Sequence, residues 1–246
     1  MPIDGSQCGS RFRISFWMTA FAIPSLVVLL GLGFWQIQRL EWKEGIIADR
    51  MERMNASPVA LNAVPVTAWQ AFELRQVHTR GVYRHDKSVE IVSRTLKGRP
   101  GVHIVTPLVL VDGSGTVLIN RGWAPPRNVR NAFEFRRPLG AAVIHGFLRA
   151  GEKTSTWVPD NDPASDIWFF ADATAIAKAR GLENVKPYVI ELSPTPGGLV
   201  GARAYPISGQ TVTEIRNNHL QYAVTWFGLA ATLVVIYVLY QVRHRS

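Results

Sequence analysis

Residues 14–37 read ISFWMTAFAIPSLVVLLGLGFWQI, and this run without a charged side chain decides how the chain is organised. As a helix, its 24 residues would reach roughly 36 Å, which exceeds the ~30 Å hydrocarbon core of a bilayer. Trp17 and Trp35 stand near its two ends, as in the aromatic belts of membrane spans. The run ends in Gly-Phe-Trp-Gln, whereas the apolar region of a signal peptide is shorter and ends in small residues. The pattern therefore predicts a retained membrane anchor rather than a cleaved signal.

A second run, Leu220–Val242, reads LQYAVTWFGLAATLVVIYVLYQV and is equally free of charge. Arg243 and Arg245 follow it at once, so it stops as a membrane span stops. Between the two runs lies a polar segment long enough for a complete domain, and its first part, Arg39–Met54, has the mixed charge of a helical extension on a solvated surface. The sequence therefore predicts two transmembrane helices that flank one extramembrane domain.

The short tails give the orientation, because cytoplasmic tails are enriched in Lys and Arg. Arg11 and Arg13 precede the first run, and the two arginines named above follow the second. Both termini are therefore expected in the cytoplasm and the central domain in the periplasm. A bacterial inner membrane is favoured because the chain lacks an Arg- and Ser-rich transit peptide. The expected order is cytoplasmic tail, first span, periplasmic domain, second span and cytoplasmic tail, at 1–13, 14–38, 39–217, 218–242 and 243–246.

The composition excludes several classes of protein. The 246 residues carry a net charge of +9 and 47% hydrophobic residues, unevenly distributed, which excludes a uniformly soluble enzyme, a disordered chain and a multi-span transporter. The single cysteine, Cys8, lies in the first tail, so no disulfide forms within the chain, and the Cys and Met clusters of a copper relay are absent. With the central domain outside the cytoplasm, the basic excess points to anionic lipid or an acidic protein partner and not to nucleic acid.

The central domain is expected to be β-rich. Short β-branched runs alternate with turns, and Asp112–Gly115 between two of them suits a hairpin. Short helices are expected at Ala68–Phe72 and at Asp172–Arg180, the second capped by Asp172 and ended by Gly181. The strand spacing predicts an antiparallel sheet that closes toward a small barrel or sandwich, in an α+β domain. The expected strands are Gly81–Arg84, Val89–Ser93, Val102–Val111, Thr116–Asn120, Ala142–Arg149, Ile167–Phe170 and Tyr188–Leu192, and Pro194–Gly198 is expected to be a linker.

No catalytic arrangement is found in the sequence of this domain. Gly113–Gly115 is a turn, because the Gly-x-Ser-x-Gly pattern of a nucleophile elbow is absent. Neither a P-loop nor a dinucleotide-binding glycine motif occurs. The histidines of the domain are separated along the chain and lack metal-binding spacing: His78, His85, His103 and His145. The sequence therefore predicts a protein that is not an enzyme and has no metal site in this domain.

His219 stands at the mouth of the second run, where an ionisable group is costly and points to a function. Helical spacing places Tyr222 and Trp226 on the same face, at i+3 and i+7. Two interpretations follow. In one, a neutral imidazole framed by aromatic surface is an axial ligand of a haem iron. In the other, His219 is an interfacial residue that bonds to lipid headgroups or to Asn217 and Asn218, and the two aromatic residues belong to a membrane belt.

Blocks of sequence along nearly the whole chain resemble the surfeit locus protein 1 family, in its bacterial form. The first and last blocks are specific to that family, and the middle ones are moderately so. In order, the blocks are GFWQIQR at Gly33–Arg39 with Trp42 and Lys43, GVY at Gly81–Tyr83, GVHIVTPL at Gly101–Leu108, VLINRGW at Val117–Trp123 with Pro125, NNHLQYA at Asn217–Ala223 and TWF at Thr225–Phe227.

The resemblance implies a non-enzymatic assembly factor of haem-copper cytochrome c oxidase. Such a factor binds haem a transiently and assists its insertion into, or stabilisation in, oxidase subunit I. The resemblance implies that His219 is the axial ligand of the haem iron, with Trp226 beside the haem, and that Arg121–Trp123 is structural or faces a partner. Tyr222 is expected beside the haem because helical spacing places it on the same face. The partners expected are subunit I, the lipid bilayer, haem A synthase and other assembly factors. The alternative is a purely structural membrane scaffold for subunit I, without haem binding.

Overall fold

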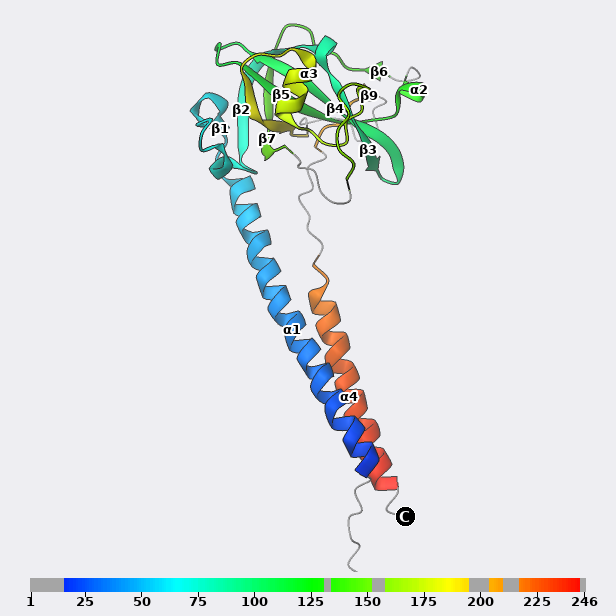
Figure 1. Cartoon of the computed structure of the whole chain (residues 1–246). Coiled ribbons are helices and arrows are strands. Elements are labelled where there is room, and N and C mark those ends of the chain that lie inside the picture. Colours follow the sequence, from blue (N-terminus) through cyan, green and yellow to red (C-terminus); the bar gives the residue numbers. More distant parts are fainter. Residues whose placement is uncertain (1–15, 131–133, 152–157, 195–203, 210–216, 244–246) are drawn as a thin grey trace, which may run out of the picture. The chain divides into compact units, whose positions relative to one another are not determined.

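A computed structural model of the chain describes residues 16–130, 134–151, 158–194, 204–209 and 217–243 (Figure 1). The tail that carries Cys8, the last three residues and all of the expected linker after Pro194 lie outside these ranges. The chain divides into two compact units, one of Met1–Ala48 with Glu214–Ser246 and one of Asp49–Thr213. The first unit holds the apolar helices and the second holds the β-sheet, as the sequence predicts.

The first unit contains helix α4 (His219–Arg243) and most of the long helix α1 (Phe16–Asn55), whose last residues, from Asp49, are counted in the second unit. Helix α1 continues through Pro24 and through the expected helical extension without a break. Both are long and apolar enough to cross a membrane, and very little of either apolar stretch is buried. Side chains such as Val27, Phe34 and Val235 lie open at the surface, unlike those of a core helix in a soluble protein. The two helices run side by side (Figure 1).

The second unit is built on a seven-stranded sheet in the order β1-β2-β7-β8-β5-β4-β3. A further antiparallel pairing of β2 with β4 closes the five strands from β2 to β4 into a barrel, which leaves β1 and β3 at the edges. The expected closure of the sheet is thus confirmed. The strands are β1 (Val59–Ala60), β2 (Gln76–Tyr83), β3 (Val89–Leu96), β4 (Arg99–Leu110), β5 (Thr116–Ala124), β7 (Ala141–Ala150) and β8 (Val185–Leu192).

The prediction of an antiparallel sheet holds for five of the strand pairings of the main sheet and is wrong for two. Strand β8 runs antiparallel to β7 but parallel to β5, and β1 is parallel to β2. A parallel neighbour needs a crossover longer than a hairpin turn, and here the segment from β7 to β8 includes helix α3 (Ala173–Arg180). A short separate pair, β6 (Glu134–Phe135) with β9 (Ala204–Tyr205), is also parallel and lacks any sequence signal.

Hydrophobic side chains pack on both faces of the barrel wall. In β5, Val117 and Ile119 point into the barrel, where they join a cluster with Tyr188, and Leu118 between them joins the outer cluster. The outer cluster is covered by α3, through Ile176. Asp172 caps this helix by accepting from the backbone N–H groups of two residues in its first turn, and Gly181 ends it in the left-handed conformation with φ 58°. Both predicted ends of α3 are confirmed.

Two expected elements of the domain take other forms. Ile167–Phe170 is no strand: it makes single β-bridges, Ile91 with Trp168 and Asp162 with Ile167. The side chain of Trp168 is instead fully buried in the outer cluster, and its Nε1 donates to Asp166 Oδ1 at 2.7 Å. A tryptophan that needs both an apolar cavity and an acceptor is better served by a loop than by a strand. The short helix expected at Ala68–Phe72 is a 3₁₀ turn, Trp69–Phe72.

Candidate functional site

The first residue of α4, His219, contacts α1 through its side chain. Its Nδ1 lies 2.7 Å from Oε1 of Gln36. Because an amide oxygen only accepts, the imidazole donates from Nδ1, and in the neutral ring the lone pair is then on Nε2. Nε2 has no hydrogen-bond partner within the described ranges. A histidine that binds a metal commonly donates its other ring N–H in this way, so His219 is held in the tautomer that suits coordination.

The imidazole of His219 is not hydrogen-bonded to Asn217, as the interfacial interpretation would have it. Asn217 Oδ1 accepts from the backbone N–H of His219 at 3.4 Å, not from its imidazole. Asn217 therefore helps to begin the helix, while the ring is directed to α1. The side chain is half-buried between the two helices.

Gln36 is a buried polar residue, 9% exposed, in an otherwise apolar helix. One turn before it, Gly33 lets the helices approach: a Cβ there would lie 2.7 Å from the ring of Phe227. Phe34 packs edge to face on the same ring, with centroids 5.4 Å apart. Farther along, Thr19 Oγ1 and Tyr237 Oη are hydrogen-bonded at 2.8 Å. The packing of α1 on α4 therefore brings the Gln36 amide to the imidazole.

Tyr222 and Trp226 lie on α4 with His219, as their spacing predicts, but they differ in environment. Tyr222 is 53% exposed, and Trp226 is half-buried. Neither ring stacks on the imidazole among the described residues. The residue that the structure brings to His219 is Gln36 from the other helix. Tyr222 and Trp226 instead present aromatic surface along α4, beyond the histidine.

A second group near the site comes from α1 alone. The guanidinium carbon of Arg39 lies 5.8 Å from the ring centroid of Trp35 and 4.9 Å from that of Trp42. The i, i+4 and i, i+3 spacing places both indoles against the cation, and all three side chains are exposed. Arg39 stands about one helical turn beyond Gln36. These residues follow Gln36 on α1, and the hydrogen bond between Gln36 and His219 shows that this part of α1 lies beside the start of α4.

The Arg121–Trp123 motif ends strand β5 in the second unit. Gly122 has φ +103° and packs against the carbonyl of Ile207, where a Cβ would overlap it. Trp123 forms a two-way backbone bridge with Ile207, at 2.9 and 2.7 Å. Both Arg121 and Trp123 are buried, at 5% and 4% exposed. The motif thus joins the barrel to the segment after β9 and carries a guanidinium into the domain.

The histidines of the barrel form no metal centre in the described chain. No group of three or more His, Cys, Asp or Glu that could hold a metal occurs there. His78 and His145, far apart in sequence, are nevertheless direct partners across β2 and β7, with ring centroids 6.1 Å apart. Strand register creates this pair, so no spacing along the chain could have revealed it.

The close contact at Gly33 can be tested by filling it. We expect Gly33→Leu to lower the thermal midpoint of the detergent-solubilised protein, by an amount corresponding to about 1–3 kcal/mol, because the new side chain must displace the Phe227 ring. The matched control is Gly31→Leu, two residues away on the same helix, where nothing lies within 4 Å of an added Cβ. Equal melting of the two variants would show that α1 does not pack on α4 at Gly33.

Comparison with known proteins identifies relatives over almost the whole chain. A sequence model described as the SURF1 family matches residues 23–231, which include Gln36 and His219. The chain is 35% identical over 230 residues to surfeit locus protein 1 of Rattus norvegicus, which covers 87% of this chain and 72% of the rat protein. It is 34% identical over 221 residues to the Homo sapiens protein of the same name, covering 83% and 71%. A SURF1-like protein of Rickettsia bellii (strain RML369-C) is 31% identical over 219 residues, covering 88% of each chain.

Proposed function

The chain belongs to the SURF1 family, and on that premise we propose that it is an assembly factor of haem-copper cytochrome c oxidase that holds haem a on His219. The observation that carries the proposal is the hydrogen bond from His219 Nδ1 to Gln36 Oε1 at 2.7 Å. It leaves Nε2 as the basic nitrogen at the outer end of α4. Here haem a is cargo: its redox chemistry belongs to the oxidase and not to this chain.

The residues around His219 fit a haem. Iron in haem proteins is commonly held by a histidine nitrogen, and a second residue that accepts from the other ring nitrogen makes the ligand more basic. Trp226 and Tyr222 provide flat aromatic surface on the helix that bears His219. Arg39, held between two indoles, provides a cation for the anionic propionate groups of the macrocycle. We therefore assign His219 to the iron, Tyr222 and Trp226 to the macrocycle, and Arg39 to the propionates.

The two apolar helices support a place in the bacterial inner membrane. Their outward side chains are apolar and exposed, which is the surface that lipid tails cover. The arginines outside the two runs favour cytoplasmic termini and a periplasmic β-barrel domain. In that arrangement His219, Gln36 and Arg39 stand near the periplasmic boundary of the membrane. Haem held there is within reach of lipid and of a membrane-embedded acceptor.

The proposed acceptor is oxidase subunit I, and the proposed donor is haem A synthase or another assembly factor. The chain contributes binding and release rather than a reaction. The runner-up is a scaffold that steadies subunit I through the helices and the β-barrel domain without touching iron. The two differ in whether His219 is needed once the protein is present in the membrane.

Complementation separates these functions. In cells that lack this chain, we expect little haem a in subunit I, and we expect the wild-type chain to restore it. The measurement is the haem a absorbance of purified oxidase per subunit I. In the same cells the chain is expected in the inner-membrane fraction after alkaline extraction. Full restoration by His219→Ala, at equal abundance in that fraction, would support the scaffold and count against haem binding as the function.

A further inference from the structure

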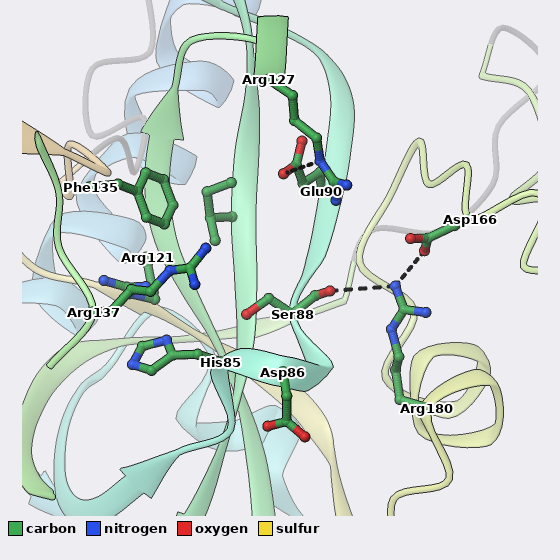
Figure 2. A pocket seen from close by; sticks show the side chains of 11 residues that line it. His85, Asp86, Ser88, Glu90, Arg121, Arg127, Phe135, Arg137, Asp166 and Arg180 are labelled. Atoms are coloured by element: carbon green, nitrogen blue, oxygen red, sulfur yellow. Dashed lines mark hydrogen bonds and ion pairs between the residues drawn. The ribbon is translucent and has the colours of Figure 1, made fainter. Parts of the chain in front are cut away.

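The β-barrel domain holds a cavity of about 570 Å³ formed by its own residues. Figure 2 shows His85, Arg121, Phe135 and Arg137 gathered on one side of it, and Asp166 with Arg180 on the other. Arg121 comes from the end of β5 and His85 from the turn before β3. The function proposed above makes no use of this cavity.

The charges that line the cavity do not balance. Each of its carboxylates is already engaged by an arginine, but Arg121 and Arg137 have no carboxylate partner among the residues that the structure describes. Two guanidinium groups are therefore in excess. The engaged pairs are Glu90 with Arg127 at 2.9 Å, Asp86 with Arg84 at 2.9 Å, and Asp166 with Arg180.

Arg121 is the most deeply placed of these cations, with 5% of its surface exposed. Its Nη2 donates to the backbone carbonyl of Arg136, and its Nη1 is buried with no hydrogen-bond partner in the described chain. The rings of Tyr83 and Phe135 lie 5.2 and 6.0 Å from its guanidinium carbon. A buried charged N–H without an acceptor is costly, so native structures rarely leave one without a reason.

The electrostatics of Arg121 also indicate that its positive charge lacks a counter-ion within the described part of the domain. Burial lowers the pKa of the Arg121 guanidinium, and the charge of Arg137 lowers it further, although Tyr83 acts in the opposite sense. Burial also raises the pKa of Tyr83 to about 12, so this phenol stays neutral and cannot serve as the counter-ion. Two positive groups thus share a cavity without an anion between them.

We propose that this cavity binds an oxyanion of the phosphate class, held by Arg137 and by the uncompensated charge of the buried Arg121 guanidinium beside it. Inorganic phosphate carries close to two negative charges and would compensate both excess guanidiniums, whereas the phosphodiester of a lipid headgroup carries one and would compensate one of them. The phosphate oxygens accept from the planar fork of a guanidinium, for which arginine is better suited than lysine. The cavity is larger than one ion needs and admits a phosphorylated headgroup. The bound group is either free inorganic phosphate or the phosphate of an anionic phospholipid headgroup.

The test is calorimetric titration of the full-length, detergent-solubilised protein with inorganic phosphate at constant ionic strength. We expect saturable binding that Arg137→Gln weakens roughly tenfold or more, because a charged hydrogen-bond donor is lost. Arg137 is exposed, so its replacement should leave the fold intact. The matched control is Arg136→Gln, which removes the same charge from the neighbouring exposed residue outside the cavity and should bind phosphate as the wild type does.

A competition arm identifies the source. Short-chain phosphatidylglycerol that displaces phosphate, and does so less well in Arg137→Gln, assigns the cavity to a lipid headgroup. Phosphate binding that the lipid leaves unchanged assigns it to free phosphate. The absence of saturable phosphate binding, or equal weakening in Arg137→Gln and Arg136→Gln, would overturn the proposal. Co-purified haem a should be unchanged in all these variants, so this result is independent of the haem site.

Discussion

The His219→Ala variant, produced together with the enzymes that make haem a, is expected to lose nearly all of the haem a absorbance that accompanies the purified wild-type protein. Its imidazole offers the one nitrogen of the site whose lone pair is set for iron, because Nδ1 is bonded to Gln36. On the proposed assignment, replacing it removes the bond to iron and leaves the haem only the contacts proposed for Tyr222, Trp226 and Arg39. The measurement is the absorbance of haem a per mole of protein after purification.

Two further variants make this result specific. His145→Ala removes an exposed histidine from the barrel and is expected to keep the haem content of the wild type. His219→Gly supplied with imidazole during purification should regain haem, because the free ligand can occupy the space of the lost side chain. If His219→Ala keeps the haem content of the wild type, so that every variant is coloured, the iron ligand lies elsewhere.

The Gln36→Leu variant is expected to bind haem a 10- to 100-fold more weakly, roughly the effect of losing a residue that orients a metal-bound histidine. Leucine fills the space between the helices but cannot accept from Nδ1, so the ring is free to rotate and to exchange its tautomer. The substitution also leaves Nδ1 of the half-buried imidazole without its acceptor, which adds to the loss of affinity. Titration of the haem-free protein with haem a, followed by absorbance, measures the affinity.

The matched control for Gln36 lies two residues along the same helix. Gln38 is exposed, so Gln38→Leu makes the same chemical change without touching His219 and should bind haem a as the wild type does. Gln36→Glu is informative as well: its carboxylate also accepts from Nδ1 and is expected to retain most of the affinity. Equal affinities of Gln36→Leu and Gln38→Leu would show that the hydrogen bond does not support the ligand.

The sequence was sufficient for the coarse architecture. Two charge-free runs suffice to predict α1 and α4, because membrane-length helices depend on local composition alone. The cap and the end of α3 follow from Asp172 and Gly181, which act within a few residues of themselves. The barrel closure was predicted from strand spacing, but the parallel placement of β8 beside β5 was not, because the crossover through α3 leaves no mark in the strand itself.

The candidate site was only half visible in the sequence. His219 is conspicuous as an ionisable residue at the mouth of an apolar run, but its partner is 183 residues away. Gln36 is one of several polar residues near the end of α1, and only the close approach at Gly33 selects it. The same limit applies to Arg121: its position before Gly122 suggests structure, while the lack of an acceptor for Nη1 depends on contacts that no local pattern encodes.

Pulsed electron paramagnetic resonance of the oxidised, haem-loaded protein tests the central claim most directly. With histidine labelled with ¹⁵N, the proposal predicts hyperfine coupling from a histidine nitrogen bound to the iron. The labelled His219→Gly protein, loaded in unlabelled imidazole, should show only the coupling of ¹⁴N at that position. Haem bound to the labelled wild type without any ¹⁵N coupling, or the same ¹⁵N coupling in labelled His219→Gly, would contradict the assignment of His219 as the ligand.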